Sequence, residues 1–133
     1  EIWKYDLVYG HTRSWGCLKK ELSSLPPNEH AISRIFKNYR AGARLSKVYF
    51  DLTRDQVASL TSGKCHYCGA SPVDHGGETN GYLWNGIDRL EREKGYISGN
   101  VVSCCWPCNF AKGKNNQRDF LELAKKVYEY NFK

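Results

Sequence analysis

Two short stretches decide the fold of this chain: Cys65-His66-Tyr67-Cys68 and Cys105-Trp106-Pro107-Cys108. A C-x-x-C turn points two thiolates at one spot, so two such turns supply the four soft ligands of a closed tetrahedral zinc site. We therefore predict a structural Zn²⁺ bound by Cys65, Cys68, Cys105 and Cys108. Such a site would tie the chain from residue 65 to residue 108 into one unit.

The six cysteines could instead form three disulfides in a secreted domain. The spacing favours metal, because adjacent Cys104 and Cys105 suit disulfides poorly, and we expect a reducing compartment, cytoplasmic or nuclear. Cys104 ends an apolar stretch and is expected to face the core, although it could replace Cys105 as a ligand. Cys17 is expected to be a small buried residue or a free thiol.

The composition favours a polyanionic partner. The 133 residues suffice for one domain, alone or with an extension. The 20 basic and 14 acidic side chains give a net charge of +6, which suits nucleic acid. The sequence has no apolar run long enough to cross a membrane, so we expect no membrane partner. Because the chain starts at Glu1 and contains no Met, we expect that it was trimmed or excised.

The chain divides into a helical, aromatic and basic extension, 1–47, and a zinc-stapled domain, 48–133. Residues 1–27 could pack on the core, form a homodimer contact or be the tail of a further domain. Residues 29–42 are predicted to form an amphipathic helix. Its apolar face comprises Ile32, Ile35, Phe36 and Tyr39.

The other face of this helix is basic. Residues 31–50 hold five basic side chains and no acidic one. Neighbouring cations repel and normally alternate with Glu, so we favour a phosphate-contacting stripe over a merely solvated face. The basic stripe consists of Arg34, Lys37, Arg40 and Arg44.

The zinc-stapled domain is predicted to begin with a short strand at 48–52. Thr53 should cap the next helix, with Gln56 completing a capping box. Two strands, 83–89 and 99–104, should form a hairpin.

Two helices should follow the hairpin. Pro107 suits the first turn of a helix that runs through Lys112. A last helix should start at about Gln117. Its inward face is expected to comprise Phe120, Leu121, Ala124 and Val127.

Strand, turn, strand and helix between zinc knuckles resemble the HNH, or His-Me finger, endonucleases, most closely the zinc-stapled kind typified by phage recombination endonuclease VII. In that family an Asp-His pair ends the first strand, an Asn begins the second, and another Asn or a His opens the helix. Here Asp88-Arg89, Asn100 and Asn109 stand in those places. The resemblance covers about residues 48–128 and implies an α+β fold of the ββα-metal type. It also gives Asn100 the role of tying the turn, and it fits a phage or mobile-element origin.

The resemblance implies an endonuclease that hydrolyses nucleic-acid phosphodiester bonds, most simply in double-stranded DNA. A divalent metal would stabilise the pentacovalent phosphate and the leaving oxygen. Mg²⁺ or Mn²⁺ takes hard oxygen ligands, here Asp88 and Asn109. Arg89 could hold a phosphate bidentately, and Lys112, one turn beyond Asn109, could contact a neighbouring phosphate.

One residue departs from the usual pattern. Arg89 replaces the His that activates water, and Arg stays protonated and is a poor base. The same Asp-Arg pair occurs in the restriction enzyme PacI. We expect His75 or Tyr96 to help activate water, with Tyr82 and His66 as further candidates.

Two alternatives stay open. One is a catalytically weak or inactive zinc-stapled module that binds nucleic acid within a larger assembly, and Arg89 is its best support. The other is a structural zinc domain in a ribonucleoprotein or phage assembly. Asp88 and Asn109 favour cleavage, because neither is needed for folding or for general phosphate binding.

Overall fold

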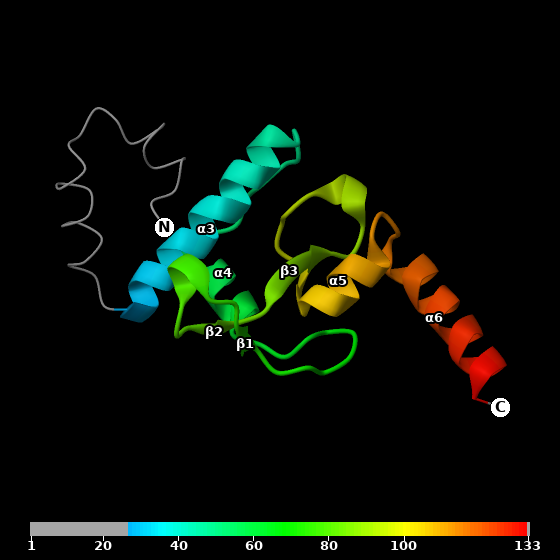
Figure 1. The fold of residues 1–133 in the computed structure, drawn as a ribbon. Coiled ribbons are helices and arrows are strands. Elements are labelled where there is room, and N and C mark those ends of the chain that lie inside the picture. The colour runs from blue at the N-terminus through cyan, green and yellow to red at the C-terminus, as the bar shows by residue number, and fades with distance from the viewer. Residues whose placement is uncertain (1–26, 133) are drawn as a thin grey trace.

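A computed structural model describes residues 27–132 of the chain, and Figure 1 shows how the elements follow one another. The segment before residue 27, with Cys17 and the predicted homodimer contact, lies outside the described residues. The elements are α3 (Pro27–Leu45), α4 (Arg54–Thr61), β1 (Val73–Asp74), the 3-10 helix η1 (Gly77–Thr79), β2 (Leu83–Trp84), β3 (Gly86–Arg89), the 3-10 helix η2 (Arg92–Lys94), β4 (Val101–Cys104), α5 (Trp106–Lys112) and α6 (Gln117–Asn131).

The predicted amphipathic helix is confirmed as α3, which extends beyond both expected ends. Its Ile35 joins one hydrophobic core with Leu52, Val57 of α4 and Ile87 of β3. Phe36 and Tyr39 are partly buried against the same core. The basic helix is therefore anchored to α4 and β3 through its apolar face.

The capping box of α4 is also confirmed. The Thr53 hydroxyl accepts a hydrogen bond from the Gln56 backbone N–H at 3.1 Å, and Gln56 Oε1 accepts one from the Thr53 N–H at 2.8 Å. This reciprocal pair satisfies two N–H groups that the first turn of a helix would otherwise leave without partners.

The strand expected at 48–52 is absent, and the segment makes a single parallel bridge between Phe50 and Tyr96. The Asp51 N–H donates to the Tyr96 carbonyl at 2.9 Å, and the Tyr96 N–H donates to the Tyr49 carbonyl at 2.8 Å. Gly95, at φ 79°, leaves so little room that an added Cβ would lie 2.6 Å from the Tyr49 carbonyl oxygen. Residues 48–52 thus meet the segment around Tyr96 at a single bridge and do not form a strand along it.

The predicted hairpin forms, but its first strand is divided. β3 pairs antiparallel with β4, with Asp88 opposite Val102, whereas β2 pairs with β1. Between β2 and β3, the buried Asn85 side chain donates to the carbonyls of Gly63 and Ala70 at 2.9 and 3.1 Å. These bonds tie residue 85 to the loops around the first knuckle and so interrupt the strand. A pattern of apolar residues does not predict such an interruption.

The two C-terminal helices begin where expected, with Pro107 in the first turn of α5 and Gln117 at the start of α6. The predicted inward face of α6 is wrong. No residue of this described helix is buried, and Leu121 and Val127 are 44% and 53% exposed. Figure 1 shows α6 extending away from the other elements. Its sequence is amphipathic, but the described chain offers no surface that covers the apolar face beyond Phe120.

Within residues 27–132, no helix combines the length and the apolar character that a membrane span needs.

Candidate metal centre and active site

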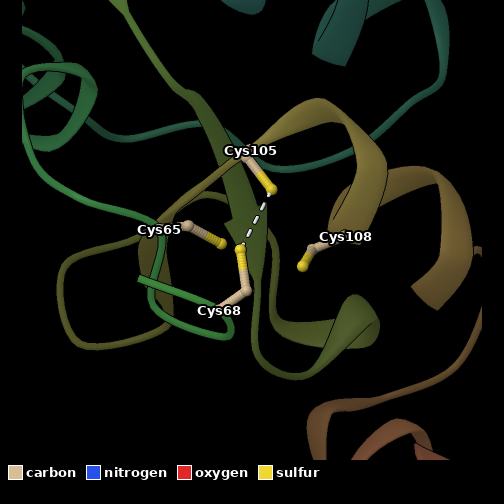
Figure 2. A group of neighbouring side chains, drawn as sticks. All are labelled: Cys65, Cys68, Cys105 and Cys108. Atoms are coloured by element: carbon tan, nitrogen blue, oxygen red, sulfur yellow. Dashed lines mark hydrogen bonds between the residues drawn. The ribbon is translucent and has the colours of Figure 1, made fainter. Parts of the chain in front are cut away.

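The four predicted cysteines converge on one point, as Figure 2 shows. The Sγ atoms of Cys65, Cys68, Cys105 and Cys108 all lie within 4.8 Å of one another. Zn–S bonds of about 2.3 Å place sulfurs about 3.8 Å apart in a tetrahedron. The separation of 3.6 Å between the sulfurs of Cys68 and Cys105 is close to that value. None of these thiols is in a disulfide, and the donor set fits Zn²⁺.

Backbone hydrogen bonds hold the first knuckle in place. The His66 N–H donates to the Ser103 carbonyl of β4 at 2.8 Å, and the Tyr67 N–H points to the Cys65 sulfur at 3.4 Å. Burial alone would raise the pKa of Cys65, but hydrogen bonds from backbone N–H groups outweigh it and lower this pKa to about 6. Cys65 is thereby prepared as a thiolate, the form that binds metal.

Cys104 has a different environment. It is fully buried, its thiol donates to the Cys105 carbonyl at 3.4 Å, and burial raises its pKa. The expectation that Cys104 faces the core is confirmed, and Cys105 is the member of the cluster.

Asp88 lies on β3 beside this cluster and is 8% exposed. Its Oδ2 accepts a hydrogen bond of 2.8 Å from the Tyr67 hydroxyl. The Lys112 ammonium lies 3.2 Å from both Oδ1 and Oδ2. Both carboxylate oxygens are therefore held in position, one of them by a residue of the first cysteine knuckle.

Lys112 is not placed where a phosphate would reach it. We expected it to contact a neighbouring phosphate, but it is 1% exposed, and its ammonium also donates to the Arg89 carbonyl at 3.0 Å. Lys112 follows Cys108 by four residues and thus shares its face of α5. Cys108 points to the cysteine cluster beside β3, so the ammonium on the same face reaches Asp88.

Tyr67 is a residue of the site that the sequence patterns did not indicate. Burial, together with the hydrogen bond to Asp88 and the charge of that carboxylate, raises the pKa of Tyr67 far above its usual value. The hydroxyl is thus fixed as a donor. The sequence signal that could have indicated Tyr67 is an aromatic residue between the two cysteines of the first knuckle. Its neighbour His66, which we considered instead, is exposed and bonds Gln117 at 2.6 Å.

Arg89 and Tyr96, two predicted site residues, lie together. The Arg89 guanidinium stands 5.0 Å from the centroid of the Tyr96 ring and donates to the Arg92 carbonyl at 2.9 Å. Burial raises the pKa of Tyr96. Asn109 is partly buried on α5, the helix that packs on β3.

Asn100 organises the turn between the hairpin strands. Its Oδ1 accepts from the Glu91 N–H at 3.0 Å, and its Nδ2 donates to the carbonyls of Glu91 and Gly95 at 2.9 and 2.8 Å. These bonds perform the tying role that the resemblance implied.

His75 belongs to another part of the fold. Its ring packs 4.5 Å from that of Trp84, and its Nε2 lies 2.8 Å from the Trp84 carbonyl oxygen. The adjacent Asp74 carboxylate accepts from the Gly76 and Gly81 N–H groups at 2.8 and 2.9 Å, which holds this loop at the β1–β2 sheet. None of the contacts described for His75 joins it to Asp88.

The basic stripe is only partly open to solvent. Arg34 forms an ion pair of 2.5 Å with Glu78, whereas Lys37, Arg40 and Arg44 are exposed. Arg40 also lies over the Phe36 ring at 5.1 Å. Three of the four predicted cations are thus presented to solvent.

The fold has a counterpart among solved structures. A structure of the rare-cutting HNH restriction endonuclease PacI matches with a TM-score of 0.55 at 17% identity, covering 74% of this chain and 78% of that one. The chain has an α+β fold similar to the HNH fold of PacI. Uncharacterized protein R423 of Acanthamoeba polyphaga mimivirus is 32% identical over 80 residues, which are 60% of this chain but 14% of that protein. No protein-family model matches the chain.

Proposed function

We propose that this chain is an HNH-like endonuclease that hydrolyses nucleic-acid phosphodiester bonds, most simply those of DNA, with Mg²⁺ or Mn²⁺. The observation that carries the proposal is the Asp88 carboxylate on β3, held against α5, the helix of Asn109. It lies beside a four-cysteine cluster in a fold similar to that of an HNH nuclease.

Each residue of the site has a proposed task. Asp88 and Asn109 would hold the divalent metal, which supplies charge stabilisation to the phosphorane-like transition state and the leaving oxygen. Arg89 would clamp the scissile phosphate after leaving the Arg92 carbonyl. Because burial raises the pKa of Tyr96, its hydroxyl suits orienting a water molecule better than taking its proton.

Lys112 and Tyr67 would act through Asp88. The Lys112 ammonium places a positive charge beside the buried Asp88 carboxylate. The Tyr67 hydroxyl fixes the direction of Asp88 Oδ2. A carboxylate offers about four lone-pair sites, so these contacts leave it able to bind a metal. The zinc would remain structural, because four thiolates leave no open position.

A binding module without cleavage is the second candidate. The Lys112 ammonium already neutralises the proposed metal-binding carboxylate, and Arg89 is a poor base. Under this alternative the exposed cations of the basic stripe would bind nucleic acid, and the buried ion pair would serve folding alone.

A nicking assay separates the two candidates. Supercoiled plasmid is incubated with the protein, with and without Mg²⁺ or Mn²⁺, beside Asp88→Ala and Asp88→Asn. The Asn variant keeps an acceptor for Lys112, and the exposed Asp51→Asn is the matched control. Loss of cutting in both Asp88 variants, with fold and binding kept, supports the nuclease. Wild-type protein that cuts neither DNA nor RNA supports the binding module, and full activity of Asp88→Asn removes Asp88 from the site.

A further inference from the structure

Helix α5, which carries Asn109 of the proposed active site, exposes two aromatic rings. Trp106 is 65% exposed and Phe110 is 73% exposed. Their ring centroids lie 5.0 Å apart with an interplanar angle of 15°, so the rings are stacked. Each ring uses one face for its partner, and their high exposure leaves apolar surface open to solvent.

The helical geometry places these rings next to Asn109. Successive residues of an α-helix are separated by about 100° around its axis. The face of α5 that carries Cys108 and Lys112 points to the zinc site and Asp88. Trp106 and Phe110 therefore stand on the opposite side, and Asn109 lies on the flank between the two faces. A strand with its phosphate at Asn109 would carry its neighbouring base past the ring pair.

The stretch of sequence that carries the ring pair is basic. Residues 101–118 contain no Asp or Glu, and their Lys114 and Arg118 are exposed. Aromatic side chains next to cations are the usual means of holding unpaired nucleic acid. The rings stack on bases, and the cations contact the backbone.

We propose that Trp106 and Phe110 form a stacking platform for an unstacked nucleobase next to the scissile phosphate. This inference rests on the proposed function, because the Asp88–Asn109 site determines where the strand runs. It also narrows the substrate class. Within an intact duplex the faces of each base are covered by its neighbours, so the platform requires single-stranded or locally unpaired nucleic acid.

The test measures binding without cleavage. A fluorescent oligothymidylate of about 16 nucleotides and an abasic deoxyribose-phosphate strand of the same length are titrated without added divalent metal. The variants are Trp106→Ala and Phe110→Ala, with Tyr130→Ala on α6 as an exposed aromatic control. We expect each platform variant to weaken binding of the base-bearing strand about 5- to 150-fold, the loss of one stacked base. Affinity for the abasic strand and the slope of binding against salt should stay unchanged.

Other outcomes would overturn the inference. Unchanged affinity of both platform variants would do so, as would an equal loss on the abasic strand. A change from dimer to monomer in Trp106→Ala, seen by sedimentation without loss of affinity, would make the rings a contact between copies. A wild-type protein that fails to cleave would contradict the nuclease proposal alone, because this assay detects base stacking independently of hydrolysis.

Discussion

The Tyr67 hydroxyl donates a hydrogen bond of 2.8 Å to Asp88 Oδ2 and thereby connects the first zinc knuckle to the carboxylate of β3. The ring of His66, the other residue between the two cysteines, bonds the Gln117 side chain instead, so Tyr67 is the knuckle residue that reaches the proposed active site. A metal bound at the four cysteines would thus do more than close the fold, because it would also help to position Asp88.

Tyr67→Phe removes this hydroxyl but keeps the ring that packs edge-on against Phe120. We expect zinc content to stay at one per chain. Stability should fall by about 1.5–3 kcal/mol, the usual contribution of a hydrogen bond to a charged group. Mn²⁺ binding, measured by electron paramagnetic resonance, should weaken because Asp88 is less well positioned. Tyr49→Phe, on an exposed side chain, is the control, and equal Mn²⁺ affinity in both variants would contradict the positioning role.

Lys112 offers a second test of the same carboxylate. Its side chain is 1% exposed and that of Asp88 is 9% exposed, so the ion pair is shielded from solvent. Lys112→Met leaves a buried charge without its partner, and we expect a loss of about 3–5 kcal/mol in urea unfolding.

Two further variants test whether that loss of stability comes from the unpaired buried charge. Asp88→Leu combined with Lys112→Met should recover much of the stability, because no buried charge remains. Lys114→Met, on an exposed side chain, should change stability by less than about 0.5 kcal/mol. A Lys112→Met protein as stable as wild type would show that solvent reaches the pair.

The local features were predictable from the sequence. The capping box depends on residues three apart, and the hairpin depends on two strands that are neighbours in the sequence, so each was confirmed within a few residues. The cysteine spacing likewise predicted the metal cluster without knowledge of the fold.

The remaining features depend on contacts between distant segments. Asn85 divides a predicted strand because its amide meets two carbonyls from the knuckle loops. Lys112 is buried because it shares a helical face with Cys108, which points to the cysteine cluster beside β3. For α6, the apolar pattern indicates an amphipathic helix but not whether the chain covers it.

Zinc removal tests the staple. We predict one zinc per chain by metal analysis, and a chelator should unfold the region from 65 to 112, since metal binding supplies folding energy in small domains. The loss of structure should be reversed by Zn²⁺ and not by Mg²⁺, because the ligands are thiolates. Folded protein without zinc, or with disulfides among these cysteines, would refute the prediction.

The basic stripe should act through charge. Removing one cation that binds a phosphate should lower the slope of log affinity against log salt by about one. We expect this effect for the exposed Lys37, Arg40 and Arg44 when each is changed to Ala. Arg34→Ala should lower the slope less, because Arg34 is already paired with Glu78. Equal slopes in wild type and all four variants would make the stripe a solvated surface.

The buried Tyr39 hydroxyl should make the stability of the protein depend on pH in the alkaline range. Burial raises its pKa to about 12, and its hydroxyl oxygen accepts the Ile87 N–H at 2.9 Å. The unfolded chain loses this proton near pH 10, whereas the folded chain keeps it to about pH 12, so stability is full below pH 10 and falls by about 3 kcal/mol between these values. Tyr39→Phe should be less stable at pH 9, because Ile87 loses its acceptor, yet it should lose less stability as the pH rises further. Urea unfolding at several pH values, with Tyr49→Phe as control, measures this difference. A variant whose stability falls as steeply as that of wild type would show that Tyr39 titrates normally.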